Sequence, residues 1–162
     1  MTDIDSLSNT YTAVNLDTTR YYRVVVKSGV CAAANSTTAG VTVSPATVAG
    51  TASGDTTVCA SGNSAVVRLT GAVGSIQWQS STDNINFNAI SGATSANYTA
   101  SSLAVTTYFR ARVKSGVCDS LFSNVVTVTV SPAAVSGSIS GAATVCYHNN
   151  STVLTLNGYT GN

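Results

Sequence analysis

The stretch FRARVK at residues 109–114 decides the fold of this chain. Apolar and cationic side chains alternate strictly along it, with Phe109, Ala111 and Val113 on one side and three cations on the other. Successive side chains of a β-strand point to opposite faces of the sheet. The stretch therefore predicts a strand that buries one face in a core and exposes the other to solvent.

Further segments of the chain carry strand signals of the same kind. In SIQWQS, at residues 75–80, Ile76 and Trp78 share one face and two glutamines share the other. Glycine and serine clusters separate these segments, as expected for turns. About seven short strands without a 3.6-residue period predict an all-β, immunoglobulin-like or fibronectin III-like sandwich. The remaining strands are expected at residues 65–69, 87–90, 97–101 and 125–130.

The chain repeats itself at an offset of 87 residues. VKSGVC at residues 26–31 returns at residues 113–118, and VTVSPATVAG at residues 41–50 returns as VTVSPAAVSG at residues 128–137. Of the 75 residue pairs that this offset aligns, 34 are identical. A unit of this length is typical of one small sandwich domain. We therefore expect one complete immunoglobulin-like repeat at residues 46–132, the C-terminal half of another at 1–45, and the N-terminal part of a third at 133–162.

The amino-acid composition argues against nucleic acid and membranes as partners. Charged residues make up 8% of the 162 residues, and the formal net charge is +1. Globular proteins usually carry about 25% charged residues. A net charge this small provides no basic surface for binding nucleic acid. In addition, no apolar run approaches the roughly 18 residues of a membrane-spanning helix. We expect partners other than nucleic acid, and no insertion into a membrane.

The sequence offers no constellation of catalytic or metal-binding residues. His148 is the only histidine, so a Ser-His-Asp or Cys-His arrangement lacks support. Asp3 and Asp5 form an Asp-x-Asp pair without the glycine and the distal glutamate of a calcium loop, and the C-x2-C spacing of zinc sites is absent. We expect a protein that is not an enzyme and that uses no cofactor and no metal.

Four cysteines, two in each period, favour disulfides and an oxidising compartment. A bridge inside the complete repeat would join Cys59 to Cys118. Cys59 precedes the second strand, however, and Cys118 follows a strand expected to run parallel to it, which places the two near opposite poles. A bridge between adjacent repeats and free thiols therefore remain open beside the bridge inside the repeat. The candidate cysteines are Cys31, Cys59, Cys118 and Cys146.

One strand offers a candidate ligand-binding surface. Arg110, Arg112 and Lys114 form a basic row that can grip a sulfated or phosphorylated glycan, and Tyr108 adds an aromatic contact. The alternative interpretation is a solvated outer face that guards against strand pairing, which is the more common role of such a row. The residues expected in the core are Trp78, Leu69, Phe109 and Val113.

The segments QWQSSTDN (residues 77–84), YTASSL (98–103) and VKSGVC (113–118) resemble the tandem immunoglobulin-like repeats of very large cell-surface proteins of the Bacteroidota. Proteins of that group are exported by the type IX secretion system and include gliding-motility adhesins. The resemblance covers the whole chain and implies an extracellular, cell-surface location, a filamentous or adhesive role and no catalytic residues. It also implies O-glycosylation within Asp-Ser/Thr motifs, at Ser6, Thr18, Thr56 and Ser120.

Three functions are compatible with these patterns. The first is a non-catalytic structural and adhesive repeat of a long bacterial surface adhesin or filament, in which neighbouring repeats are the partners. The second is a binding module for a surface glycan or a host protein. The third is a self-complementing fibre subunit, in which residues 133–162 of one chain supply early strands and residues 1–45 of another supply late strands. The composite domain would lack the strand that carries Trp78, which ranks this function third.

Overall fold

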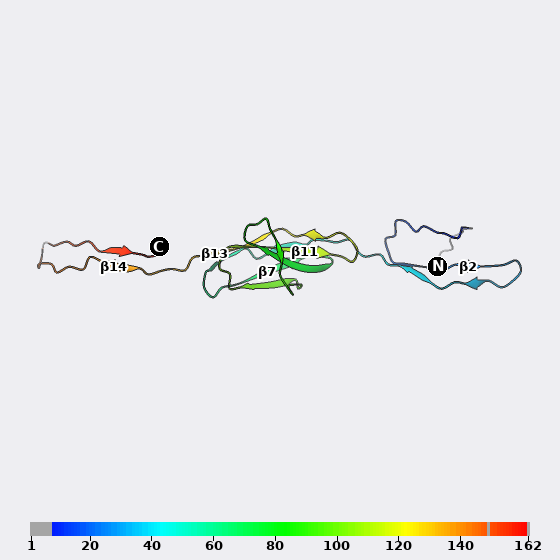
Figure 1. Ribbon diagram of the computed structural model, residues 1–162, viewed down its shortest axis with the longest axis horizontal. Coiled ribbons are helices and arrows are strands. Elements are labelled where there is room, and N and C mark those ends of the chain that lie inside the picture. The colour runs from blue at the N-terminus through cyan, green and yellow to red at the C-terminus, as the bar shows by residue number, and fades with distance from the viewer. Residues whose placement is uncertain (1–7, 149, 162) are drawn as a thin grey trace.

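The computed structural model describes residues 8–148 and 150–161, and every regular element among them is a β-strand. The molecule is elongated, with a two-layered body in the middle and an extended segment of paired strands at each end (Figure 1). The body contains β5 (Thr51–Ser53), β6 (Thr56–Cys59), β7 (Ser64–Thr70), β8 (Ser75–Ser81), β9 (Asn88–Ala89), β10 (Asn97–Ser101), β11 (Thr107–Lys114), β12 (Leu121–Phe122) and β13 (Val126–Ser131).

Two sheets make up the body. The smaller sheet has the strand order β10-β7-β5, and the larger has the order β6-β13-β11-β8-β9, with β12 also paired to β11. Neighbouring strands are antiparallel except β6 and β13, which pair in parallel from Thr56 opposite Val128 to Cys59 opposite Ser131. The predicted all-β sandwich is confirmed.

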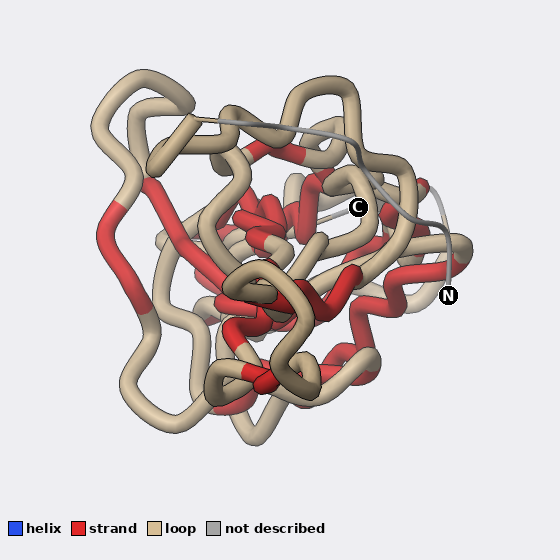
Figure 2. The backbone as a smooth tube through the Cα atoms, turned by 90° about the vertical axis from the view of Figure 1, so that its right-hand side faces the viewer, coloured by secondary structure: helices blue, strands red, loops and turns tan. Residues whose placement is uncertain are grey.

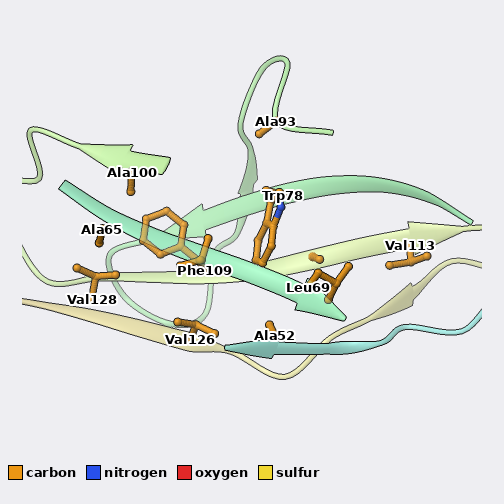
Figure 3. Packing of buried hydrophobic residues seen from close by; sticks show 12 residues of the cluster. Ala52, Ala65, Leu69, Trp78, Ala93, Ala100, Phe109, Val113, Val126 and Val128 are labelled. Carbon is orange, nitrogen blue, oxygen red and sulfur yellow. The ribbon is translucent and has the colours of Figure 1, made fainter. Parts of the chain in front are cut away.

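The core lies between the two sheets and follows from the alternation in the sequence. Along β11 every second side chain is buried, and β7 repeats this pattern from the opposite sheet. Trp78 of β8 is fully buried at the centre of the core (Figure 3), and its indole Nε1 donates a hydrogen bond to the Ser95 carbonyl at 3.0 Å. The four residues expected in the core all lie in it: Trp78, Leu69, Phe109 and Val113.

The N-terminal segment repeats strand pairings of the body at an offset of 87 residues. Arg20 lies opposite Val41, as Thr107 lies opposite Val128. The pairing of Val25 with Asn35 likewise matches that of Arg112 with Phe122. The strands involved are β1 (Arg20–Tyr22), β2 (Val25–Val26), β3 (Ala34–Asn35) and β4 (Ala39–Val41).

The C-terminal segment follows the same rule. It pairs β14 (Ser138–Ser140) with β15 (Thr155–Asn157), and Ile139 lies opposite Leu156 as Ala52 lies opposite Leu69. Neither terminal segment has an opposing sheet among its described residues. The apolar side chains of Ile139 and Leu156 are therefore exposed, whereas their counterparts in the body are buried.

The chain enters and leaves the body at opposite ends. We call the end next to residues 1–45 the N-pole and the end next to residues 133–162 the C-pole. At the N-pole, β7 and β11 end, and Val48 forms a bridge with Val73. At the C-pole, β6 and β13 end side by side. The terminal segments and the body follow one another along the long axis of the molecule (Figure 1), which Figure 2 views end-on.

Candidate binding face

The outer face of the larger sheet carries the basic row. Because Phe109, Ala111 and Val113 point into the core, the intervening side chains of β11 point outward. The register with β8 places Arg110 beside Gln79 and Arg112 beside Gln77. The structure thus brings together on one face the four residues predicted to contact a ligand: Tyr108, Arg110, Arg112 and Lys114.

Arg110 is held by the protein itself. Its guanidinium carbon lies 4.1 Å from the centroid of the Phe87 ring and 4.2 Å from that of the Phe122 ring. Its Nε also donates a hydrogen bond to Gln79 Oε1 at 2.9 Å. Cation–π contacts of this kind stabilise the charged group on the aromatic faces. Arg110 therefore organises the surface, because its guanidinium already contacts two aromatic rings and Gln79.

Arg112 and Lys114 are exposed at the N-pole end of the row. Within residues 8–148 and 150–161, the single ion pair joins Arg20 to Asp17, so neither Arg112 nor Lys114 has an acidic partner there. The positive charge of this part of the face is therefore left uncompensated by the described residues. A dianionic or polyanionic ligand has two adjacent cations to contact.

A shallow hollow of about 240 Å³ lies between the turn after β8 and the start of β11. Asp83 anchors this turn: its carboxylate accepts hydrogen bonds from the Ser81 hydroxyl at 2.7 Å and from the Ile85 and Asn86 amides at 2.8 Å each. Together with the Asn86 side chain, these donors hold the pKa of Asp83 far below its ordinary value, with Ser81 the largest cause. The carboxylate is thus committed to the turn.

The cysteines lie at opposite poles, as their places in the sequence suggested. Cys59 ends β6 at the C-pole, opposite Ser131. Cys118 lies at the N-pole, with its Sγ 3.6 Å from the Pro45 carbonyl oxygen. The length of β11 alone, roughly 26 Å at about 3.3 Å per residue, separates them, and a disulfide requires α-carbons within about 7 Å. The interpretation in which Cys59 and Cys118 form a disulfide within one repeat is therefore wrong.

The remaining cysteines follow the same placement. Cys31 and Cys146 are the counterparts of Cys118 and Cys59 at an offset of 87 residues. Cys31 lies between β2 and β3 in the N-terminal segment, and Cys146 lies between β14 and β15 in the C-terminal segment. All four cysteines of the chain are free thiols in the structure.

The predicted glycosylation sites differ in accessibility. Thr18 and Thr56 are exposed, whereas Ser120 is half-buried. Ser6 lies outside the described residues, and so do Asp3 and Asp5. In the part of the chain that the structure describes, no group of three or more His, Cys, Asp or Glu side chains is placed to hold a metal ion. That same part contains no helix long and apolar enough to cross a membrane.

The comparison with protein families gives one match. Residues 1–45 and 48–132 match the family described as Domain of unknown function (DUF8696). The two matched stretches meet beside the Ser-Pro dipeptide at Ser44 and Pro45. No curated protein and no solved structure matches the chain.

Proposed function

We propose, for a chain that belongs to the DUF8696 family, that its sandwiches are immunoglobulin-like structural units arranged in series in a long extracellular adhesin or filament of a bacterial cell surface. The observation that carries this proposal is the common strand register of the body and both terminal segments at one offset of 87 residues. In this role the units act as spacers, and their partners are the neighbouring repeats.

The strand order of the body supports the immunoglobulin-like assignment. In such sandwiches the strand that carries the buried tryptophan lies beside the penultimate long strand of one sheet. Trp78 lies on β8, which pairs along seven residues with β11. The opposite poles of entry and exit support serial arrangement, because each further repeat then extends the chain along the same axis.

The link between repeats is short and fixed to the body. The only two prolines, Pro45 and Pro132, each precede a repeat and restrict the backbone there. The Thr47 hydroxyl accepts a hydrogen bond from the Ser115 amide at 3.1 Å. A linker held by contacts of this kind keeps successive units aligned, as a spacer requires.

The test of the serial role is mechanical. We expect that stretching single molecules by their ends gives one cooperative unfolding event from the complete repeat. This event should release about 300 Å of chain, less the folded length of the unit, at roughly 3.3–3.6 Å per residue. Atomic force spectroscopy measures this length directly. A smooth extension without an event of that size would contradict the proposed function.

A second candidate function is favoured by the uncompensated charge at one end of the basic row. Arg112 and Lys114 are exposed without an acidic partner among the described residues, and Tyr108 lies on the same face. Such a surface suits a sulfated or phosphorylated glycan, since charge-assisted hydrogen bonds to anionic oxygens are the stronger ones.

Replacing Arg112 with serine tests this second function. We expect Arg112→Ser to lower the salt concentration that elutes the chain from immobilised heparin, and the further change Lys114→Ser to lower it again. The matched control is Arg68→Ser, which removes one exposed cation from β7 in the opposite sheet. If both single variants elute alike, net charge explains the retention and the face has no specific role.

A further inference from the structure

We propose that a disulfide joins adjacent repeats across each junction. It would link the cysteine that ends β6 of one repeat to the cysteine that follows β11 of the next. The inference rests on the proposed serial arrangement and adds to it a specific covalent link. Cys59 and Cys118 show where the two thiols of every repeat lie.

At the C-pole, Cys59 lies beside the start of the next junction. It is opposite Ser131 in the parallel ladder, and the amide after it, that of Ala60, donates a hydrogen bond to the Ser131 carbonyl at 2.9 Å. Val58 packs against the core, so the alternation along β6 directs Cys59 to the outer face of the sheet. Its side chain is exposed and open to a partner.

At the N-pole, Cys118 lies against the preceding junction. Its Sγ is 3.6 Å from the Pro45 carbonyl oxygen. The turn that carries it is packed on the same dipeptide, because a Cβ added at Gly116 would collide with the Ser44 hydroxyl. Gly116 also has a φ of +50°, which favours glycine. The turn from Ser115 to Cys118 is therefore fixed against Ser44 and Pro45.

Cys59 and Cys118 lie beside equivalent Ser-Pro dipeptides, Cys59 beside the one that follows its repeat and Cys118 beside the one that precedes it. Ser131 and Pro132 are the counterparts of Ser44 and Pro45 at the offset of 87 residues. Cys59 therefore flanks the dipeptide that the following repeat's counterpart of Cys118 must also contact. Paired strands are about 4.8 Å apart, and consecutive α-carbons about 3.8 Å. Both thiols thus approach one Ser-Pro dipeptide within distances of the order that a disulfide requires.

Pairing between adjacent repeats agrees with the four free thiols of the chain. The partner of Cys59 would lie 87 residues beyond Cys118, past Asn162, and the partner of Cys146 lies farther still. The partners of Cys31 and Cys118 would precede Met1 by the same reasoning. Under the proposed pairing, no two of the four cysteines of the chain are partners of each other.

The bond would form by thiol–disulfide exchange with a small-molecule or protein disulfide. The thiolate of one cysteine attacks that disulfide and releases one thiolate of the oxidant. The thiolate of the second cysteine then attacks the mixed disulfide, forms the bridge and releases the other thiolate of the oxidant. Two cysteine thiols lose two protons and two electrons, and the oxidant is reduced to two thiols.

An extended chain tests the proposal. A second copy of residues 46–132 is inserted after Pro132, so that two complete repeats are adjacent, and Cys31 and Cys146 are changed to serine. In the first variant, Cys118→Ser in the first copy and Cys59→Ser in the second leave the facing pair. In the second variant, Cys59→Ser in the first copy and Cys118→Ser in the second leave the outward pair.

Both variants are oxidised with glutathione disulfide at low protein concentration. We expect the facing pair to lose both free thiols and to give a linked peptide by mass spectrometry without reductant. The outward pair should give no linked peptide, because each of its thiols stops at the mixed disulfide with glutathione. A linked peptide in neither variant, or in both, would overturn the proposal. Small-angle scattering tests the serial arrangement separately: an extended chain without a linked peptide refutes the bridge alone, and a chain that is not lengthened refutes the serial arrangement.

Discussion

Replacing Phe109 with alanine is expected to lower the free energy of unfolding of the complete repeat by about 3–5 kcal/mol, the usual cost of removing a buried phenylalanine. The Phe109 side chain is 1% exposed, and its ring lies 5.9 Å from that of Tyr98 across the two sheets. The cavity left by its loss would be lined by β7, β10 and β13, which cannot close it without shifting their ladders. Trp78 stays in place as the fluorescence reporter.

The repeat supplies the control for this change. Tyr22 is the counterpart of Phe109 at the offset of 87 residues, and it lies in the N-terminal segment, where the described residues form no opposing sheet. We expect Tyr22→Ala to change the unfolding of the body by less than about 1 kcal/mol, within the range of surface substitutions. Urea titration of both variants gives the comparison. Equal losses would mean that the terminal segment and the body unfold as one unit.

Replacing Asn63 with alanine should cost about 2–3 kcal/mol, because it removes three hydrogen bonds of about 1 kcal/mol each. Its side-chain amide donates to the carbonyls of Cys59 at 2.8 Å and Leu103 at 2.7 Å, and its Oδ1 accepts from the Leu103 amide at 2.8 Å. These bonds hold the turn after β6 against the turn after β10 at the C-pole. In Asn63→Ala, the Cys59 carbonyl and the Leu103 carbonyl and amide would need water molecules as hydrogen-bond partners.

Two further variants make the Asn63 prediction specific. Asn63→Asp keeps the acceptor for Leu103 but places a carboxylate oxygen against the Cys59 and Leu103 carbonyl oxygens, so we expect a loss at least as large as that of alanine. Asn150, the counterpart of Asn63, donates to the Cys146 carbonyl at 2.7 Å in the C-terminal segment. Asn150→Ala should leave the urea midpoint of the body, followed by Trp78 fluorescence, unchanged. An unmoved midpoint for Asn63→Ala would show that solvent replaces these bonds without loss.

The sequence predicted best the strands whose burial alternates. The central strands β7, β8, β11 and β13 lie within about one residue of their expected bounds at most ends, and their inward faces are as expected. By contrast, β5, β6 and β12 were not predicted, because strands of two to four residues carry too few side chains to display a period. The strand expected at residues 87–90 is reduced to Asn88–Ala89, and the Phe87 ring lies against Arg110.

The sequence predicted only those features of the candidate face that follow from the alternation of side chains along β11. Alternation alone placed Tyr108, Arg112 and Lys114 on one surface. It could not show that Phe87 and Phe122 both contact Arg110, because the sequence does not reveal which segments lie beside β11. The sequence did predict that Cys59 and Cys118 lie near opposite poles, because that prediction needs only the direction of each strand.

The parallel ladder between β6 and β13 determines how the unit meets tension. β6 lies near the start of the repeat and β13 at its end, and four consecutive pairs join them from Val128 opposite Thr56 to Ser131 opposite Cys59. When the two poles are pulled apart, these strands slide along each other, so their hydrogen bonds are sheared together instead of being peeled open one at a time. The unit should therefore resist abrupt stretching more strongly than its modest core would suggest, and yield all at once when the ladder fails.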